Sequence, residues 1–168
     1  MIAVGSGAHK LLKTVGIESL IHPADAAPRQ GSYQRGRDQM RSYQTAKLAV
    51  TTWIYGLARR WAGRGVTANV FDPGIVKGQM GEQFEGPALT GVLMSHLIPF
   101  FVAAGMPRGS QQYVRLAADP TLATVSGRYF VRGKEKGPGS SPLSLDPIIQ
   151  QRIDDAAEAW ATPFLRGQ

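Results

Sequence analysis

The chain contains the stretch Ser42-Tyr43-Gln44-Thr45-Ala46-Lys47, which begins a helical run that continues from Leu48 to Trp61. Tyr43 and Lys47 stand four residues apart, so a helix places them one above the other on the same face. An ammonium this close to a phenol favours the phenolate over the phenol, which suits an acid or base catalyst. Because Tyr-x-x-x-Lys alone occurs often by chance, its meaning depends on the sequence around it.

Two predicted strands flank this helix. Ile2 to Val4 is a short apolar strand that ends in Gly5-Ser6-Gly7, and Val66 to Phe71 is a buried strand that leads into Asp72-Pro73-Gly74-Ile75-Val76. The order strand, helix, strand favours a parallel sheet with helical crossovers. The apolar stripe of the helix repeats at helical spacing and consists of Val50, Ile54, Leu57 and Trp61.

Four further segments follow from local signals. Residues 11–41 are polar and contain several prolines and glycines, which predicts an irregular connection. A second helix is predicted from about Arg108 to Ala118, where Pro120 stops it. Residues 133–142 are predicted to be a Gly/Pro/Ser linker, and Pro147 then opens a final amphipathic helix. Its apolar positions are Ile149, Ile153, Ala157 and Trp160.

Taken together, these motifs resemble the short-chain dehydrogenase/reductase family, in particular its retinol-dehydrogenase-like branch. Residues 2–10 resemble the family's strand that delivers the catalytic serine, and the helix with Tyr43 and Lys47 resembles its active-site helix. Pro73-Gly74 resembles the loop that caps the nicotinamide. Residues 109–120 and 126–130 resemble the branch's penultimate helix and last strand. Several spaced matches in the right order are more specific than any one of them.

The resemblance implies an α/β fold of one domain over residues 1–168, a partial Rossmann-like, doubly wound parallel sheet with about three strands and flanking helices. It divides the domain into a serine strand (1–10), a catalytic helix (42–64), a strand with the Pro-Gly loop (66–76), a substrate-lid region (78–107), and the last helices and strand (108–168).

The activity that the resemblance implies is NAD(P)-dependent interconversion of an alcohol and a carbonyl, on a lipophilic substrate. Tyr43 would exchange a proton with the substrate oxygen, Lys47 would tune Tyr43 and bind the nicotinamide ribose, and Ser6 would orient the substrate oxygen. The expected cofactor-binding residues are Tyr43, Lys47, Pro73, Gly74, Ile75 and Val76.

Each of these residues also has a purely structural interpretation. Tyr43 could be an ordinary half-buried tyrosine, Ser6 a turn residue, and Pro73-Gly74 a simple turn. His9 is interpreted as local structure rather than as a catalyst. Three positions depart from the family pattern: Gly5 replaces the usual first serine, Asp72 the usual histidine or asparagine, and Gly78 a common threonine.

The family's opening strand, glycine-rich turn and helix, which bind the cofactor pyrophosphate, do not occur in this sequence. The resemblance is therefore to the C-terminal half of the family's domain, and the residues that choose between NAD and NADP are expected upstream of Met1. Three explanations stay open: a full enzyme whose reading frame starts earlier, a truncated non-catalytic remnant that serves as a binding or interaction module, and an interfacial protein.

Charge and composition limit the kinds of partner and site that the sequence predicts. The net charge is +7, from 19 basic and 12 acidic residues, which indicates either an anionic partner or an uneven division of charge within a larger domain. Arg29, Arg35, Arg37 and Arg41 cluster, but only Tyr33 interleaves them, so nucleic-acid binding is not predicted. With no cysteine, and with His22 and His96 isolated, the sequence predicts no disulfide and no metal site.

Residues 88–106 carry no formally charged side chain. We favour a substrate lid or core segment here, with an interfacial helix and a membrane span as alternatives, because Pro99 would break a spanning helix. The absence of cysteine and of a signal-peptide pattern fits a cytoplasmic location, with membrane-surface contact through 88–106 as the alternative. The sequence leaves the oligomeric state open, a homo-oligomer included.

Overall fold

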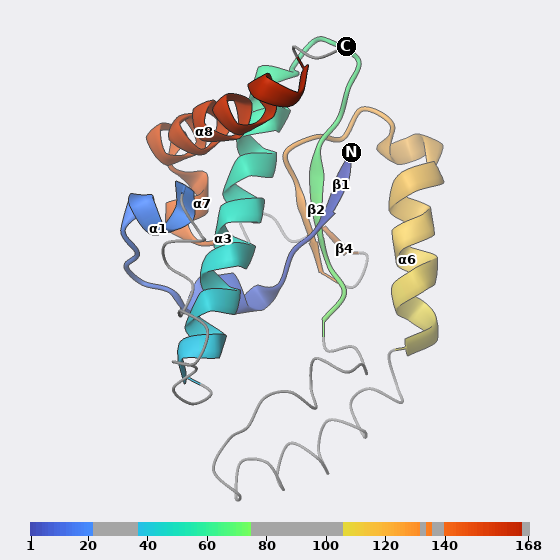
Figure 1. Cartoon of the computed structure of the whole chain (residues 1–168). Coiled ribbons are helices and arrows are strands. Elements are labelled where there is room, and N and C mark those ends of the chain that lie inside the picture. Colours follow the sequence, from blue (N-terminus) through green and yellow to red (C-terminus); the bar gives the residue numbers. More distant parts are fainter. Residues whose placement is uncertain (22–36, 75–105, 132–133, 136–139, 166–168) are drawn as a thin grey trace, which may run out of the picture.

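A four-stranded sheet forms the centre of the computed structural model, which describes residues 1–21, 37–74, 106–131, 134–135 and 140–165 (Figure 1). The strands are β1 (Ile2–Val4), β2 (Asn69–Asp72), β3 (Tyr129–Val131) and β4 (Lys134–Glu135), and they lie in that order. The first three are parallel, and β4 pairs antiparallel with β3. The predicted partial Rossmann-like α/β fold is confirmed, with β4 added in a segment predicted as linker.

Helices cover both faces of this sheet. The long helix α3 (Arg37–Arg60) lies on one face and α6 (Met106–Ala118) on the other (Figure 1). Three further helices pack on the side of α3 that faces away from the sheet: α1 (Ile17–Ile21), α7 (Pro142–Leu145) and α8 (Pro147–Leu165). Because α3 lies between the sheet and these helices, it is the central element of the fold.

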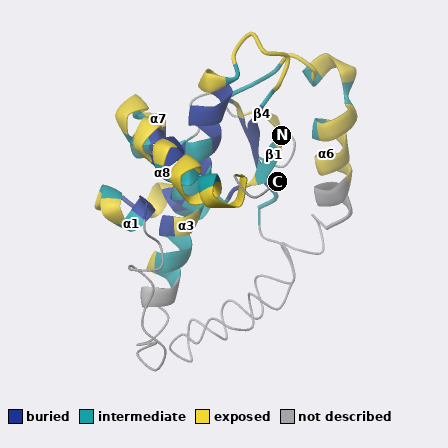
Figure 2. Cartoon of the chain, turned by 45° about the horizontal axis from the view of Figure 1, so that its top comes forward, coloured by how far each residue is buried: buried dark blue, intermediate teal, exposed yellow. Residues whose placement is uncertain are grey.

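The core therefore has two parts, one on each side of α3. The inner cluster fills the space between α3 and the sheet and consists of Ile54, Tyr55, Leu57, Ala58, Ala68, Val70 and Tyr129. The outer cluster joins α3 to α1 and α8 and consists of Leu12, Leu20, Ile21, Leu48 and Ile153. Figure 2 shows the middle of α3 as buried, whereas much of the described surface of α6 is exposed.

The predicted apolar stripe of α3 is correct but too narrow. Of its four residues, Ile54 and Leu57 are buried, whereas Val50 and Trp61 are only partly buried. Thr51 and Thr52 lie outside the stripe and are also fully buried, and their hydroxyls donate to the carbonyls of Lys47 and Leu48 at 2.7 and 2.8 Å. A helix with neighbours on two sides buries polar residues that can satisfy themselves on their own backbone.

A close approach joins α3 to α8. A Cβ at Gly56 would lie 3.3 Å from the backbone oxygen of Gln150, so a side chain there would push the helices apart. One turn on, Arg60 donates to Asp154 at 3.0 Å and also pairs with Glu158. Trp53 donates its indole N–H to the same Asp154 at 3.3 Å. The carboxylate of Asp154 thus holds two side chains of α3.

Element boundaries differ from the sequence predictions in three places. The irregular connection predicted for residues 11–41 is wrong at both ends, because α1 lies within it and α3 begins at Arg37 rather than at Ser42. Strand β2 begins at Asn69, and Val66, predicted as its buried start, is 47% exposed. The final helix opens at Pro147 as predicted.

The predicted lid, residues 78–107, lies almost wholly outside the described residues, as does the uncharged segment 88–106. Among the described helices, none combines the length and the hydropathy that crossing a membrane requires.

Candidate active site

The candidate site residues gather at one edge of the sheet. Strands β1 and β2 are parallel, so their carboxyl ends meet at the same edge, which is where open α/β sheets bind ligands. Ser6 follows β1, and Pro73 and Gly74 follow β2. The predicted cofactor-binding residues Ile75 and Val76 lie outside the described residues.

Ser6 caps the short 3-10 helix Gly7–Leu11. Its extended backbone and its side-chain oxygen are typical of a cap: Oγ accepts from the backbone N–H of Ala8 at 3.3 Å. In this bond the hydroxyl acts only as an acceptor, so its own hydrogen can still be donated to another oxygen. The structural role of Ser6 and its predicted catalytic role are therefore compatible.

Tyr43 and Lys47 lie one turn apart on α3, as the sequence predicts. The ammonium of Lys47 lies 5.7 Å from the centroid of the Tyr43 ring, within the range of a cation–π contact. It also donates to the backbone oxygen of Val4 at 3.0 Å. Since Val4 ends β1, just before Gly5 and Ser6, this bond ties α3 to the serine turn.

The turn at Pro73 and Gly74 is held by the aspartate before it. Gly74 has φ +77°, a left-handed conformation that favours glycine, and its N–H donates to Asp72 Oδ1 at 2.8 Å. The other oxygen, Oδ2, accepts from the Tyr129 hydroxyl at 3.0 Å. A Cβ at Gly7 would lie 3.3 Å from that same oxygen, so the serine turn and the Pro-Gly turn are adjacent.

Gly5 explains one departure from the family pattern. Its N–H donates to the oxygen of Phe71 at 2.8 Å and so continues the ladder between β1 and β2. A Cβ at this position would lie 2.5 Å from Cγ1 of Val70, closer than real contacts allow. A serine here would force Val70 or the neighbouring strand to shift, so this packing favours Gly5.

Sequence reasoning missed a buried polar network under this edge. It contains His9, Asp72 and Tyr129 together with three serines of the C-terminal segment, Ser140, Ser141 and Ser144. Burial, and then the charge of Asp72, raises the pKa of Tyr129 far above its usual range, so Tyr129 stays a phenol. Only the Ser141-Pro142 pair carried a local signal, that of a helix N-terminus, and it lay in the predicted linker.

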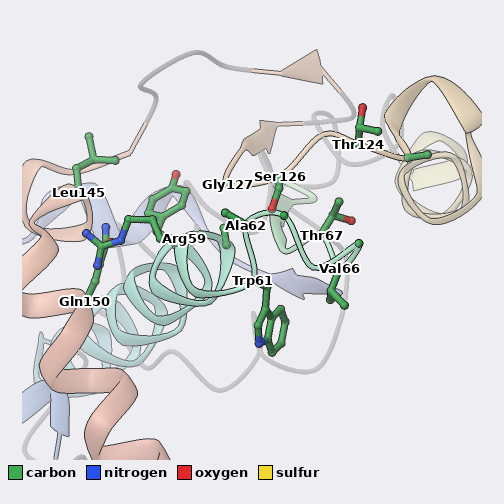
Figure 3. Close-up of a pocket in the computed structure, with 15 residues that line it drawn as sticks. Arg59, Trp61, Ala62, Val66, Thr67, Thr124, Ser126, Gly127, Leu145 and Gln150 are labelled. Atoms are coloured by element: carbon green, nitrogen blue, oxygen red, sulfur yellow. The ribbon is translucent and has the colours of Figure 1, made fainter.

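A separate groove lies near the amino ends of the strands, opposite to the candidate site. Its volume is about 680 Å³, and its lining includes Thr67, just before β2, and Arg59 near the end of α3. In Figure 3 the side chains of Arg59 and Gln150 lie at one end of this groove and Thr124 at the other. None of the candidate catalytic residues lines it, and the described residues hold no cluster of metal-binding side chains.

Comparison with known proteins gives named relatives. Retinol dehydrogenase 14 of Homo sapiens is 34% identical over 116 residues, which are 69% of this chain and 34% of that protein. Retinol dehydrogenase 13 of Mus musculus is 31% identical over 125 residues, 68% of this chain and 36% of that protein. A probable oxidoreductase of Streptomyces antibioticus is 27% identical over 172 residues, 90% of this chain and 57% of that protein.

These matches cover only part of each relative, and the chain spans about a third of the length of the two retinol dehydrogenases. No family model matches the chain, and no solved structure matches it significantly. The names of these relatives agree with the family that the sequence resembles, and the parallel strands β1 to β3 fit that family's expected fold. The chain belongs to the short-chain dehydrogenase/reductase family, in its retinol-dehydrogenase-like branch.

Proposed function

We propose that the chain carries the substrate side of the active site of an NAD(P)-dependent oxidoreductase that interconverts an alcohol and a carbonyl. The observation that supports this best is the bond from Lys47, beside Tyr43, to Val4 at the end of the strand that leads into Ser6. A phenol, an ammonium and a hydroxyl then share the edge of a parallel sheet that suits a bound cofactor.

Each side chain has a distinct task in this proposal. A nicotinamide cofactor, when bound, supplies or accepts the hydride. In the direction of reduction, Tyr43 gives its hydroxyl proton to the carbonyl oxygen as the carbonyl carbon gains a hydride, and the product is an alcohol. Ser6 donates a hydrogen bond to the same oxygen and orients it, and Lys47 favours the phenolate that Tyr43 becomes.

The described residues fit the nicotinamide end of such a cofactor. Lys47 offers donors for the ribose hydroxyls, and the Pro73-Gly74 turn lies next to the serine turn through Asp72. We propose that Ile75 and Val76 extend this cofactor-binding loop. No α-helix opens from a glycine-rich turn among the described residues, so a pyrophosphate has no evident site within them. The choice between NAD and NADP is not part of the proposal.

The proposed substrate is a small lipophilic alcohol or carbonyl compound, because two of the relatives are named retinol dehydrogenases. Residues 78–107 would cover it as a lid. Contact of residues 88–106 with a membrane surface and formation of a homo-oligomer stay predictions.

Calorimetric titration of the 168-residue chain with NADPH and with NADH tests the proposal first. A dissociation constant below about 100 μM would support a cofactor pocket within this chain. Absence of binding to either would overturn the proposal for this chain and leave it only for a longer protein.

Reduction of retinal then tests the catalytic roles. We expect Tyr43→Phe to lower turnover about 10²- to 10⁴-fold, the usual contribution of a positioned acid or base. Tyr113→Phe removes a hydroxyl from a tyrosine of α6 that is 40% exposed and serves as the matched control. Equal turnover in the two variants would contradict the role of Tyr43.

A further inference from the structure

A buried histidine joins the serine turn to the C-terminal segment. The His9 side chain is fully buried, with Nδ1 2.5 Å from the backbone oxygen of Ser6. On its other side, Nε2 lies 2.9 Å from the hydroxyl oxygen of Ser140 and 3.4 Å from the backbone nitrogen of Ser141. Ser140 and Ser141 follow His9 by 131 and 132 positions in the sequence.

The partners define the protonation state of His9. The Ser6 carbonyl can only accept, so Nδ1 carries the hydrogen, and the Ser141 N–H can only donate, so Nε2 carries the lone pair. His9 is therefore the neutral imidazole with its hydrogen on Nδ1. A second hydrogen on Nε2 would face the Ser141 N–H, and that contact would be lost.

The same ring reaches the Pro-Gly turn through Tyr129. The ring centroids of His9 and Tyr129 lie 5.3 Å apart, with an angle of 49° between the ring planes. The Tyr129 hydroxyl donates to Asp72, which in turn accepts from Gly74. His9 thus bonds directly to the serine turn and is linked to the Pro-Gly turn through Tyr129 and Asp72, although it belongs to neither turn.

Ionisable groups from several elements surround the imidazole: Lys10 on the same 3-10 helix, Asp72 on β2, Tyr129 on β3, and Tyr55 on α3, which hydrogen-bonds to Ser140. Burial is the main cause that lowers the pKa of His9, and Lys10 lowers it further. The bond to the Ser6 carbonyl and the charge of Asp72 oppose this shift. The net effect favours the neutral form that the hydrogen bonds require.

We propose that neutral His9 is a positioning residue: Ser140 and Ser141 hold its ring, and the ring fixes the Ser6 turn relative to the Pro73-Gly74 turn through Tyr129 and Asp72. The inference rests on the proposed function only in treating these two turns as parts of the active site. His9 would not touch the substrate or the cofactor. It would act by holding the backbone that presents the Ser6 hydroxyl.

Hydrogen exchange by NMR on the full chain tests this without cofactor or turnover. The reporters are the amide hydrogens of Ala8 and Gly74, which bond to Ser6 Oγ and Asp72 Oδ1. His9→Leu should lower the protection factors of these two amides at least about tenfold more than it lowers those of the amides that exchange only by global unfolding. This is the effect expected when a buried group loses its partner. Ile153→Ala in the outer cluster is the control, because it destabilises the fold away from the site.

A second variant and a spectroscopic measurement keep the test decisive if His9→Leu does not fold. His9→Gln keeps one donor and one acceptor and stays neutral at every pH, so it should restore protection of Ala8 and Gly74 and keep it constant between about pH 7 and pH 5. Wild-type protection should fall over this range, and the ¹⁵N shifts of His9 should report the hydrogen on Nδ1.

Three results would overturn the proposal: a hydrogen on Nε2, protection in wild type that does not depend on pH, or His9→Leu affecting Ala8 and Gly74 no more than Ile153→Ala does. Failure of the chain to bind NADPH or NADH would count against the proposed function alone, since none of these readouts uses a cofactor.

Discussion

The ammonium of Lys47 donates to the backbone oxygen of Val4 at 3.0 Å, and this bond lies on the side of β1 that faces away from β2. The odd-numbered neighbours pair with β2: Gly5 donates to Phe71, and Met1 accepts from Asn69. Because backbone groups of a strand alternate in direction, the Val4 oxygen points to the other side. Lys47 therefore donates to a carbonyl that β2 leaves unpaired, while it lies beside Tyr43.

Removal of this bond should be measurable in the free energy of unfolding. We expect Lys47→Met to lower it by about 1 kcal/mol, the usual net value of one hydrogen bond, in urea unfolding followed by circular dichroism. Lys13→Met, which replaces an exposed lysine, should change it by less than about 0.5 kcal/mol. Equal losses in both variants would show that the bond to Val4 contributes nothing.

Gly5 offers a test of packing under the serine turn. Gly5→Ser, which restores the family's usual residue, should lower the free energy of unfolding by about 1–3 kcal/mol because its Cβ meets Val70. Trimming the obstacle should relieve this: the double variant Gly5→Ser, Val70→Ala should lose less than the sum of the two single variants. Strict additivity would mean that the clash does not exist in solution.

The hydroxyl of Tyr129 should contribute to the free energy of unfolding because it donates a hydrogen bond to the buried carboxylate of Asp72. Tyr129→Phe leaves Oδ2 of Asp72 without this donor, and we expect a loss of about 1–3 kcal/mol in thermal or urea unfolding. In the Asp72→Asn background the same substitution should cost less, since no charge is left unpaired. A loss of the same size in both backgrounds would argue against the bond between Tyr129 and Asp72.

The two-sided burial of α3 predicts a contrast between helices. Leu48→Ala empties a fully buried position and should cost about 2–5 kcal/mol. Val114→Ala on α6 alters a residue that is 62% exposed and should change stability by no more than about 0.5 kcal/mol. If Val114→Ala proved the more damaging of the two, α6 would have to be buried in solution by a partner.

The lowered pKa of His9 also predicts how stability depends on pH. The unfolded chain binds a proton to this histidine below about pH 6.5, whereas the folded chain resists it, so the free energy of unfolding should fall as the pH drops below 6.5. His9→Gln should remove this part of the decline, which appears as a shrinking difference between the variant and wild type from pH 7 to pH 5. A constant difference would mean that His9 titrates equally in both states.

Sequence reasoning could predict those parts of the candidate site that local patterns encode. The spacing of Tyr43 and Lys47, the strand before Ser6 and the turn after Asp72 each carry their own signal, and the parallel sheet brings them to one edge. The start of α3 at Arg37 was missed because the segment before Ser42 is polar and has no clear cap.

The buried network could not be predicted in the same way. Nothing local marks Ser140 or Ser141 as partners of His9, because the contact joins distant segments and depends on how α7 and α8 pack against α3. The role of Gly5 is similar, since the obstacle to a side chain there is Val70 on the neighbouring strand. Packing between distant segments, rather than local secondary-structure propensity, determines the partners of His9 and the preference for glycine at position 5.

The long-range hydrogen bonds from His9 to Ser140 and Ser141 also affect the order in which parts of the protein can fold. During synthesis from the N-terminus, the serine turn leaves the ribosome well before Ser140 and Ser141, so its histidine finds Ser140 only after a further 131 positions of the chain have emerged. Closing so long a loop is slow compared with forming α3. The serine turn is therefore made before Ser140 but fixed only after it, and a nascent chain that stops before Ser140 would carry Ser6, Tyr43 and Lys47 without the buried support that the finished fold gives to the serine turn.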